Sequence, residues 1–403
     1  MNRIGLNRIE SSSERLSVPN APLPIHPTNT NTNTNNRPST HISDPHDLPI
    51  TVKIINDFTA QGYGVLALPP SHLTQLNPSN PPPIPNGNKV VIGPGTGLGF
   101  CYLTSDVPPV DSSDSSEEED VAVGSYTVHS SEGGHGDFTA RNDVEREVLK
   151  HLCLTYRSEE CNPSTGVACR VSTERVISGT GITNVYSAIR GINKSDRSVA
   201  KRLGVPKTTA WVDDRVDASP LSEKAAIVSR AAAEKGDPAC RMAMEIFKDS
   251  LAHEIGCAIL RFLPGGGVYI SGGVTAKNFG LVRDGGFWEG VADRGRLRGI
   301  VESTPVYAVE MCEGVGVLGA GVYGMKVFKG LERERERERE GDTEGDTEGD
   351  TKGGAGVKKK KKMMRRVEKS GGAGGGLFYF ALAGWALAAT LAASAAVRSK
   401  QRR

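Results

Sequence analysis

The sequence predicts an α/β fold from alternating short β-branched runs and longer amphipathic patterns. Runs rich in valine and isoleucine at residues 51–55, 90–92, 268–271 and 306–309 are typical of strands. Apolar residues at helical spacing predict helices over 143–156, 182–189 and 221–235. Asp237 followed by Pro238 marks the start of a further helix, expected to run to about residue 262. In such folds ligands bind where strands end, so we expect the binding and catalytic residues at the ends of the strands.

The loop at residues 93–99 has glycine at every second position and lies between two strand-like runs. Without Cβ atoms, Gly95-Thr96-Gly97 can bring several backbone N–H groups close to an anion, usually phosphate. It is not a Walker A loop, because no Lys-Ser/Thr follows, nor a Rossmann fingerprint, because a strand follows instead of a helix. Strand, glycine loop, strand is how actin- and sugar-kinase-type ATPases hold a nucleotide phosphate. An ordinary tight hairpin is the alternative.

Length and composition narrow the function classes. The 403 residues suffice for one large or two ordinary domains, and the net charge of +2 does not indicate a nucleic-acid partner. The seven cysteines form no CxxC pair and have no histidine at zinc spacing, so we expect no metal site built from them. Scattered, odd-numbered cysteines favour a reducing compartment.

Shifts in composition divide the chain into segments. We expect a disordered leader over 1–48, a globular domain over 49–330 with an acidic surface insert at 105–120, and a charged low-complexity linker over 331–376. In this linker the Glu-Arg alternation at 332–340 can extend a helix, whereas the Gly-Asp-Thr-Glu repeats at 341–351 cannot. Residues 377–397 are uncharged, have basic flanks and are long enough to cross a bilayer. They predict a transmembrane tail anchor, and a buried alanine-rich helix is the alternative.

Polar clusters follow several of the predicted strands. Asn56-Asp57 end the run at 51–55, where the pair could cap a helix or supply a general base and a hydroxyl ligand. Glu132 and His135 lie in a glycine-rich loop that suits a polyol, with a metal site or a bland exposed loop as alternatives. Glu174 precedes a strand-like run and would be an ordinary surface acid on its own. Glycines 272–273 and the glycine-rich segment 314–321 could admit a nucleotide or serve tight packing.

Taken together and in order, these motifs resemble the bacterial-type glucokinase family. The matching segments are residues 55–60, 92–99, 132–138, 174–179 and 269–273, with a matching end at 286–287 and 314–321. The resemblance covers roughly residues 49–325. The related repressor/kinase sugar family has a cysteine-rich zinc motif after its histidine, and this sequence has none.

The resemblance implies a ribonuclease-H-like, actin/hexokinase-type fold that transfers the γ-phosphoryl group of ATP, with Mg²⁺, to the 6-hydroxyl of glucose. It implies that Asp57 is the general base and Asn56 a sugar ligand. It assigns the other glucose hydroxyls to Glu132, His135 and Glu174. The ATP-binding residues would be Gly95, Thr96, Gly97, Gly272 and Gly273. A homodimer is a further expectation, as is a kinase domain held in the cytosol at a mitochondrial or plastid outer membrane.

The sequence departs from the family at its start. The family opens with a strand and an Asp-x-Gly-Gly-Thr loop, its first phosphate- and Mg²⁺-associated element, and residues 1–48 contain nothing like it. Most of the smaller domain that closes over the sugar is likewise not found. Because a kinase cleft needs two walls to exclude water, we expect a weak or inactive kinase. The alternative function is a catalytically silent, membrane-anchored sugar-binding or scaffold protein.

Overall fold

The computed structural model describes residues 53–109, 125–160, 170–310 and 314–344. Its contacts separate an N-terminal unit ending at Ile55 from a second unit that begins at Asn56. Of the first unit only residues 53–55 are described, and the sheet and helices belong to the second unit. The predicted leader, residues 110–120 of the acidic insert, the linker beyond residue 344 and the span 377–397 lie outside the described residues.

A six-stranded mixed sheet forms the centre of the unit, in the order β1-β6-β5-β2-β3-β4. β2, β3 and β4 form an antiparallel meander, β5 and β6 run parallel to β2, and β1 is an antiparallel edge strand on β6. This arrangement agrees with the predicted α/β, ribonuclease-H-like sheet. The strand bounds are β1 Leu73–Gln75, β2 Lys89–Pro94, β3 Leu98–Ser105, β4 Tyr126–Ser131, β5 Val268–Ile270 and β6 Val306–Val309.

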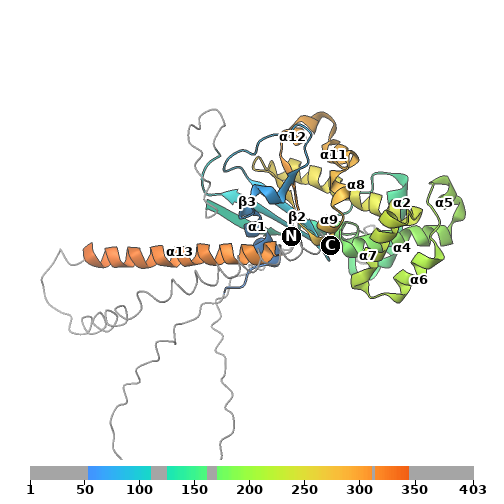
Figure 1. The fold of residues 1–403 in the computed structure, drawn as a ribbon, viewed down its shortest axis with the longest axis horizontal. Helices are drawn as coiled ribbons and strands as arrows, with labels where there is room; N and C mark the ends of the chain where they lie inside the picture. The colour runs from blue at the N-terminus through green and yellow to red at the C-terminus, as the bar shows by residue number, and fades with distance from the viewer. Residues whose placement is uncertain (1–52, 110–124, 161–169, 311–313, 345–403) are drawn as a thin grey trace, which may run out of the picture. The chain divides into compact units, whose positions relative to one another are not determined.

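Each face of this sheet is covered by helices, and the strand side chains alternate between the two faces. Val90 and Ile92 of β2 lie in one apolar cluster, with α8 (Pro238–Phe262) and its neighbours, whereas Val91 lies in the other. This follows from the two-residue period of a strand. Figure 1 shows the second cover, where α1 (Asp57–Leu66) lies beside the start of α13 (Val315–Glu344).

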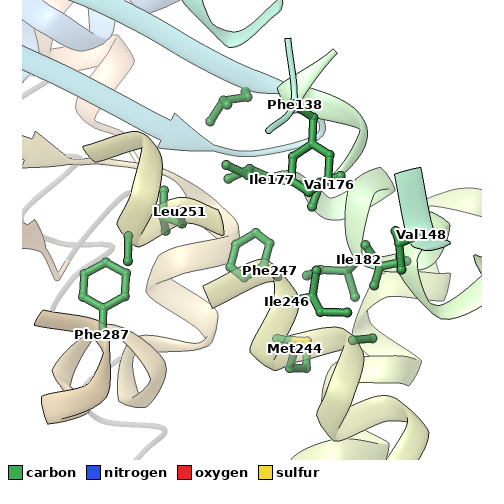
Figure 2. Close-up of a cluster of buried hydrophobic side chains, with 14 of the residues drawn as sticks. Phe138, Val148, Val176, Ile177, Ile182, Met244, Ile246, Phe247, Leu251 and Phe287 are labelled. Carbon is green, nitrogen blue, oxygen red and sulfur yellow. The ribbon is translucent and has the colours of Figure 1, made fainter. Parts of the chain in front are cut away.

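The larger cluster gathers the helices that follow the meander. Phe247 of α8 is 2% exposed, and Figure 2 shows it among apolar side chains from several helices. Asp237 caps α8 by accepting from Cys240 N at 2.9 Å, as the sequence predicted. The remaining helices are α2 Asp143–Thr155, α3 Arg157–Glu160, α4 Gly179–Ser195, α5 Arg197–Arg202, α6 Ala210–Ala218, α7 Leu221–Glu234, α9 Gly273–Lys277, α10 Phe279–Arg283, α11 Gly285–Ala292 and α12 Arg298–Glu302, with 3-10 turns η1 Pro70–His72, η3 Gly133–His135, η4 Thr173–Arg175 and η5 Gly295–Leu297.

Close backbone approach joins α1 to α13. A Cβ atom on Gly319 would overlap the carbonyl of Ala60, and one on Gly64 would overlap the carbonyl of Val315. Only glycine permits this distance. Gly319 therefore serves helix packing, which was one of the two interpretations of the segment 314–321.

Three local expectations were wrong. Residues 53–55 form no strand, and residues 175–177 close a 3-10 turn instead of extending. A strand requires a neighbouring backbone for its N–H and C=O groups, so a β-branched run alone does not make one. In addition, α13 continues to Glu344 and so includes residues 341–344, the first Gly-Asp-Thr-Glu repeat. The predicted domain boundary at Gly330 falls inside this helix.

The prediction of a C-terminal transmembrane helix was also wrong. Of the helices in the described ranges, none is both long enough and apolar enough to cross a bilayer. The 25-residue α8 is buried within the domain, and the 30-residue α13 carries the Glu-Arg alternation. The expected tail-anchored membrane localisation rested on that helix alone and is overturned with it.

Candidate active site

The glycine loop forms the tight connection between β2 and β3. Gly95 N donates to Gly97 O at 2.8 Å, which closes the turn on itself. The backbone N–H groups of Thr96 and Gly97 have no acceptor within the described part of the chain, and Thr96 is exposed. Two unpaired donors on adjacent residues are an arrangement that can accept an anion.

Helix α4 begins at this loop. Gly179 N donates to Gly95 O at 2.8 Å, and Thr180 Oγ1 donates to Thr96 O at 3.3 Å. Ser178 caps the helix by accepting from Gly181 N at 2.8 Å. The positive end of a 17-residue helix thus adds to the field at the loop. The sequence showed a Ser-Gly-Thr-Gly run before a helix, but did not reveal that it would meet the loop.

Glu174 lies directly against the glycine loop. Its Oε2 accepts from Leu98 N at 3.0 Å, and a Cβ atom on Gly97 would overlap that same oxygen. The carboxylate thus occupies the space that glycine leaves open. This residue looked like a surface acid when considered alone, and the fold makes it part of the loop.

Glu132 and His135 lie on the neighbouring turn η3. Glu132 Oε2 is 3.7 Å from His135 Nε2, and both side chains are more than half exposed. A Cβ atom on Gly134 would overlap the carbonyl of Leu98, so η3 packs on the first residue of β3. Leu98 therefore links this turn to Glu174, and three of the four predicted sugar ligands lie around the glycine loop.

Buried hydroxyls attach η3 to η4. Ser172 Oγ is 3.2 Å from His135 Nδ1, and Thr173 Oγ1 donates to Gly136 O at 3.0 Å. Arg170 donates to the carbonyl of His135 and to Asp137 Oδ1. Sequence reasoning missed Ser172, because a serine in a loop gives no signal until the fold places it beside a histidine.

Asn56 and Asp57 begin α1. Asn56 Oδ1 caps the helix by accepting from Phe58 N at 2.9 Å and Thr59 N at 3.1 Å, so the capping interpretation describes this side chain. Asp57 is the first helical residue and is exposed. The ring of Phe58 fills the space above Gly93 and Gly99, which flank the loop. Asp57 thus lies one residue from a ring packed on the loop's two strands.

Gly272 follows β5 and packs on β2. A Cβ atom on Gly272 would lie 2.7 Å from Pro94 N and would overlap Pro94 O, whereas nothing lies within 4 Å of one on Gly273. Packing therefore requires glycine at residue 272, whereas Gly273 lies beside open space. Among the described residues, no three His, Cys, Asp or Glu side chains are grouped to hold a metal ion.

Comparison with known proteins identifies the family. The model of the family described as Glucokinase matches residues 29–327. The chain belongs to the glucokinase family. It is 35% identical over 271 residues to a glucokinase of Synechocystis sp., covering 67% of this chain and 68% of that protein. It is 31% identical over 274 residues to a glucokinase of Nostoc punctiforme, covering 67% and 70%. A crystal structure of glucokinase from an Antarctic psychrotroph matches with a TM-score of 0.48 at 24% identity and covers 66% of each chain. The family assignment does not use this match, because its TM-score is low.

The family confirms the resemblance seen in the sequence. A glucokinase is an enzyme that phosphorylates glucose with ATP, and this is the activity to which the chain is assigned. The chain spans about two thirds of the length of these relatives.

A methyl group at Gly272 is expected to destabilise this glucokinase-family domain. Gly272→Ala forces the new Cβ against the backbone of Pro94, which should lower the free energy of unfolding by about 1–3 kcal/mol. Gly273→Ala is the matched control, since its Cβ meets nothing, and should change stability by less than about 1 kcal/mol. Urea unfolding of both variants measures the difference. Equal stabilities would show that the contact between Gly272 and Pro94 does not constrain the strand ends.

Proposed function

We propose that this chain transfers the γ-phosphoryl group of ATP to the 6-hydroxyl of glucose at the glycine loop of residues 95–97, with Asp57 as the general base. The observation that carries the proposal is the pair of unpaired N–H groups on Thr96 and Gly97, at the start of α4 and beside Glu174. An anion site next to a carboxylate-lined polar cluster suits a phosphate donor and a polyol acceptor.

The sugar is expected to bind to the oxygen and nitrogen acceptors around Leu98. Glu132 and His135 on η3 and Glu174 on η4 are accessible to a ligand and lie on turns joined to each other. Hydroxyl donors of glucose suit such acceptors. Asn56 is expected to donate a hydrogen bond to the sugar from its Nδ2 group, because its Oδ1 already accepts from the start of α1.

The nucleotide is expected to place its phosphates on the loop and its adenosine beside Gly272 and Gly273. Backbone N–H groups and the α4 terminus suit phosphate oxygens, and the open side of Gly273 admits a flat group. Mg²⁺ usually binds through one or two carboxylates together with substrate phosphates. We therefore expect Mg²⁺ to arrive with ATP, bound to its phosphates and to one or two carboxylates of the site.

In the transfer, the 6-hydroxyl oxygen forms a bond to the γ-phosphorus while the bond to the bridging oxygen of ADP breaks. The hydroxyl proton passes to the Asp57 carboxylate. Such reactions depend mainly on positioning and on neutralising oxygen charge, which the loop and the helix terminus supply. The homodimer named among the expected partners stays a prediction.

The test is formation of glucose 6-phosphate from glucose and ATP by the whole chain. Glu174→Ala should raise the KM for glucose roughly 10- to 100-fold, because a charged acceptor is lost. Glu289→Ala removes a carboxylate of α11 that pairs with Arg298 of α12, and it should leave the KM unchanged. Glucose binding in calorimetry without turnover would contradict the proposal and favour the silent sugar-binding alternative.

A further inference from the structure

Ser172 lies between a histidine ring and a buried carbonyl. It is 2% exposed, and its Oγ is 3.2 Å from His135 Nδ1 and 3.4 Å from Gly134 O. A serine hydroxyl carries one proton and can donate only one hydrogen bond. Two partners compete for that proton, and the choice determines which ring nitrogen of His135 is protonated.

The carbonyl of Gly134 decides the competition. Gly134 is the buried residue of η3, and in the described part of the chain the Ser172 hydroxyl is the donor within reach of its oxygen. A buried carbonyl left without a donor is costly, whereas His135 Nδ1 can serve as a donor itself. The Ser172 proton therefore goes to Gly134 O, and Ser172 Oγ accepts from a protonated Nδ1.

We propose that Ser172 is a positioning residue that selects, for the uncharged form of the His135 ring, the tautomer with its proton on Nδ1 and its lone pair on Nε2. The inference rests on the proposed function only in giving His135 a sugar hydroxyl to bind. The hydrogen bond made by one ring nitrogen sets the state of the other. Ser172 touches the histidine and does not touch the reacting atoms.

In this tautomer His135 Nε2 and the Glu132 carboxylate are both hydrogen-bond acceptors, and neither donates to the other. His135 Nε2 is 3.7 Å from Glu132 Oε2, too far for a hydrogen bond. A lone pair and a carboxylate side by side favour a ligand that offers two neighbouring hydroxyl donors. The other charged groups at this turn are Arg170, which donates to the carbonyl of His135, and Asp137, which pairs with Arg170.

The first test reads the tautomer directly in the whole chain. Long-range ¹H–¹⁵N correlation spectra, recorded at a pH where histidines are neutral, distinguish the protonated from the unprotonated ring nitrogen. His135→Gln assigns the signal among the eight histidines. We expect a protonated Nδ1 in the unaltered protein and a shift towards protonated Nε2 in Ser172→Ala. A protonated Nε2 in the unaltered protein would overturn the inference, whether or not any variant folds.

The second test separates positioning from structure. Thr173→Val removes the neighbouring buried hydroxyl, which also joins η4 to η3 but does not touch His135. Ser172→Ala should raise the KM for glucose about tenfold with kcat within about twofold, the order expected for one hydrogen bond. Thr173→Val should leave both constants and the His135 spectrum unchanged. Equal effects of the two variants would overturn the positioning role. An unchanged KM in His135→Gln would contradict the proposed sugar contact instead, and would leave the tautomer assignment standing.

Discussion

Replacing Asp57 by asparagine is expected to lower kcat for glucose phosphorylation by about 100- to 10,000-fold. The amide keeps the size and hydrogen-bonding shape of the side chain but cannot accept the hydroxyl proton. The KM for glucose should stay within about threefold, because the sugar contacts proposed for Glu132, His135 and Glu174 remain. Steady-state kinetics with varied glucose at saturating ATP measures both constants.

Helix α2 offers a matched control, because Asn142-Asp143 repeats the arrangement of Asn56-Asp57. Asn142 caps α2 by accepting from Glu145 N, and Asp143 is the first helical residue. Arg146 beside it lowers the pKa of the Asp143 carboxyl, so this group is ionised at neutral pH. Asp143→Asn should weaken the helix start only slightly, because the group is exposed to solvent, and should leave kcat unchanged. Full turnover by Asp57→Asn would show that another group accepts the proton.

Phe247→Ala is expected to lower the free energy of unfolding by about 3–5 kcal/mol. The ring is 2% exposed and lies in the cluster that joins α8 to the sheet and its neighbours (Figure 2). Its removal leaves a cavity that rigid helices fill only in part, which adds to the lost burial. Denaturant unfolding, followed by circular dichroism, measures the change.

Leu221→Ala is the comparison for this core change. Leu221 begins α7 and is 62% exposed, so its truncation should alter stability by less than about 0.5 kcal/mol. A loss in Phe247→Ala as small as that in Leu221→Ala would mean that the cluster repacks around the missing ring. Activity of Phe247→Ala should persist at temperatures where the protein stays folded, since no predicted ligand contacts the ring.

The sequence predicted the elements whose signals are local. Asp237-Pro238 placed the start of α8, and valine-rich runs located β2, β5 and β6. It failed where a partner decides the outcome: residues 53–55 have a strand composition but form no strand, while β4 was not recognised. A strand exists through its neighbour, and the pairing of β4 with β3 cannot be read from the residues of β4 alone.

The candidate site divides in the same way. The glycine loop was recognisable because glycine at every second position is typical of a loop whose backbone approaches a ligand closely. The contact of Glu174 with Leu98 N joins residues 76 positions apart, and that of Ser172 with His135 joins residues 37 apart. Local patterns do not encode such distances. The ordered set of motifs indicated that these residues belong together, and the structure showed through which atoms they meet.

The backbone contact between α1 and α13 has a mechanical consequence for the proposed base. Asp57 is the first residue of α1, and Gly64 and Gly319 lock that helix against α13 with no side chain in between. Where side chains interdigitate, their rotation can absorb a small relative movement of two helices. Two backbones in direct contact have no rotatable side chain between them to absorb it. A tilt or shift of α13 is therefore expected to move α1 and the Asp57 carboxylate with it, although the two helices lie more than 250 residues apart in the chain.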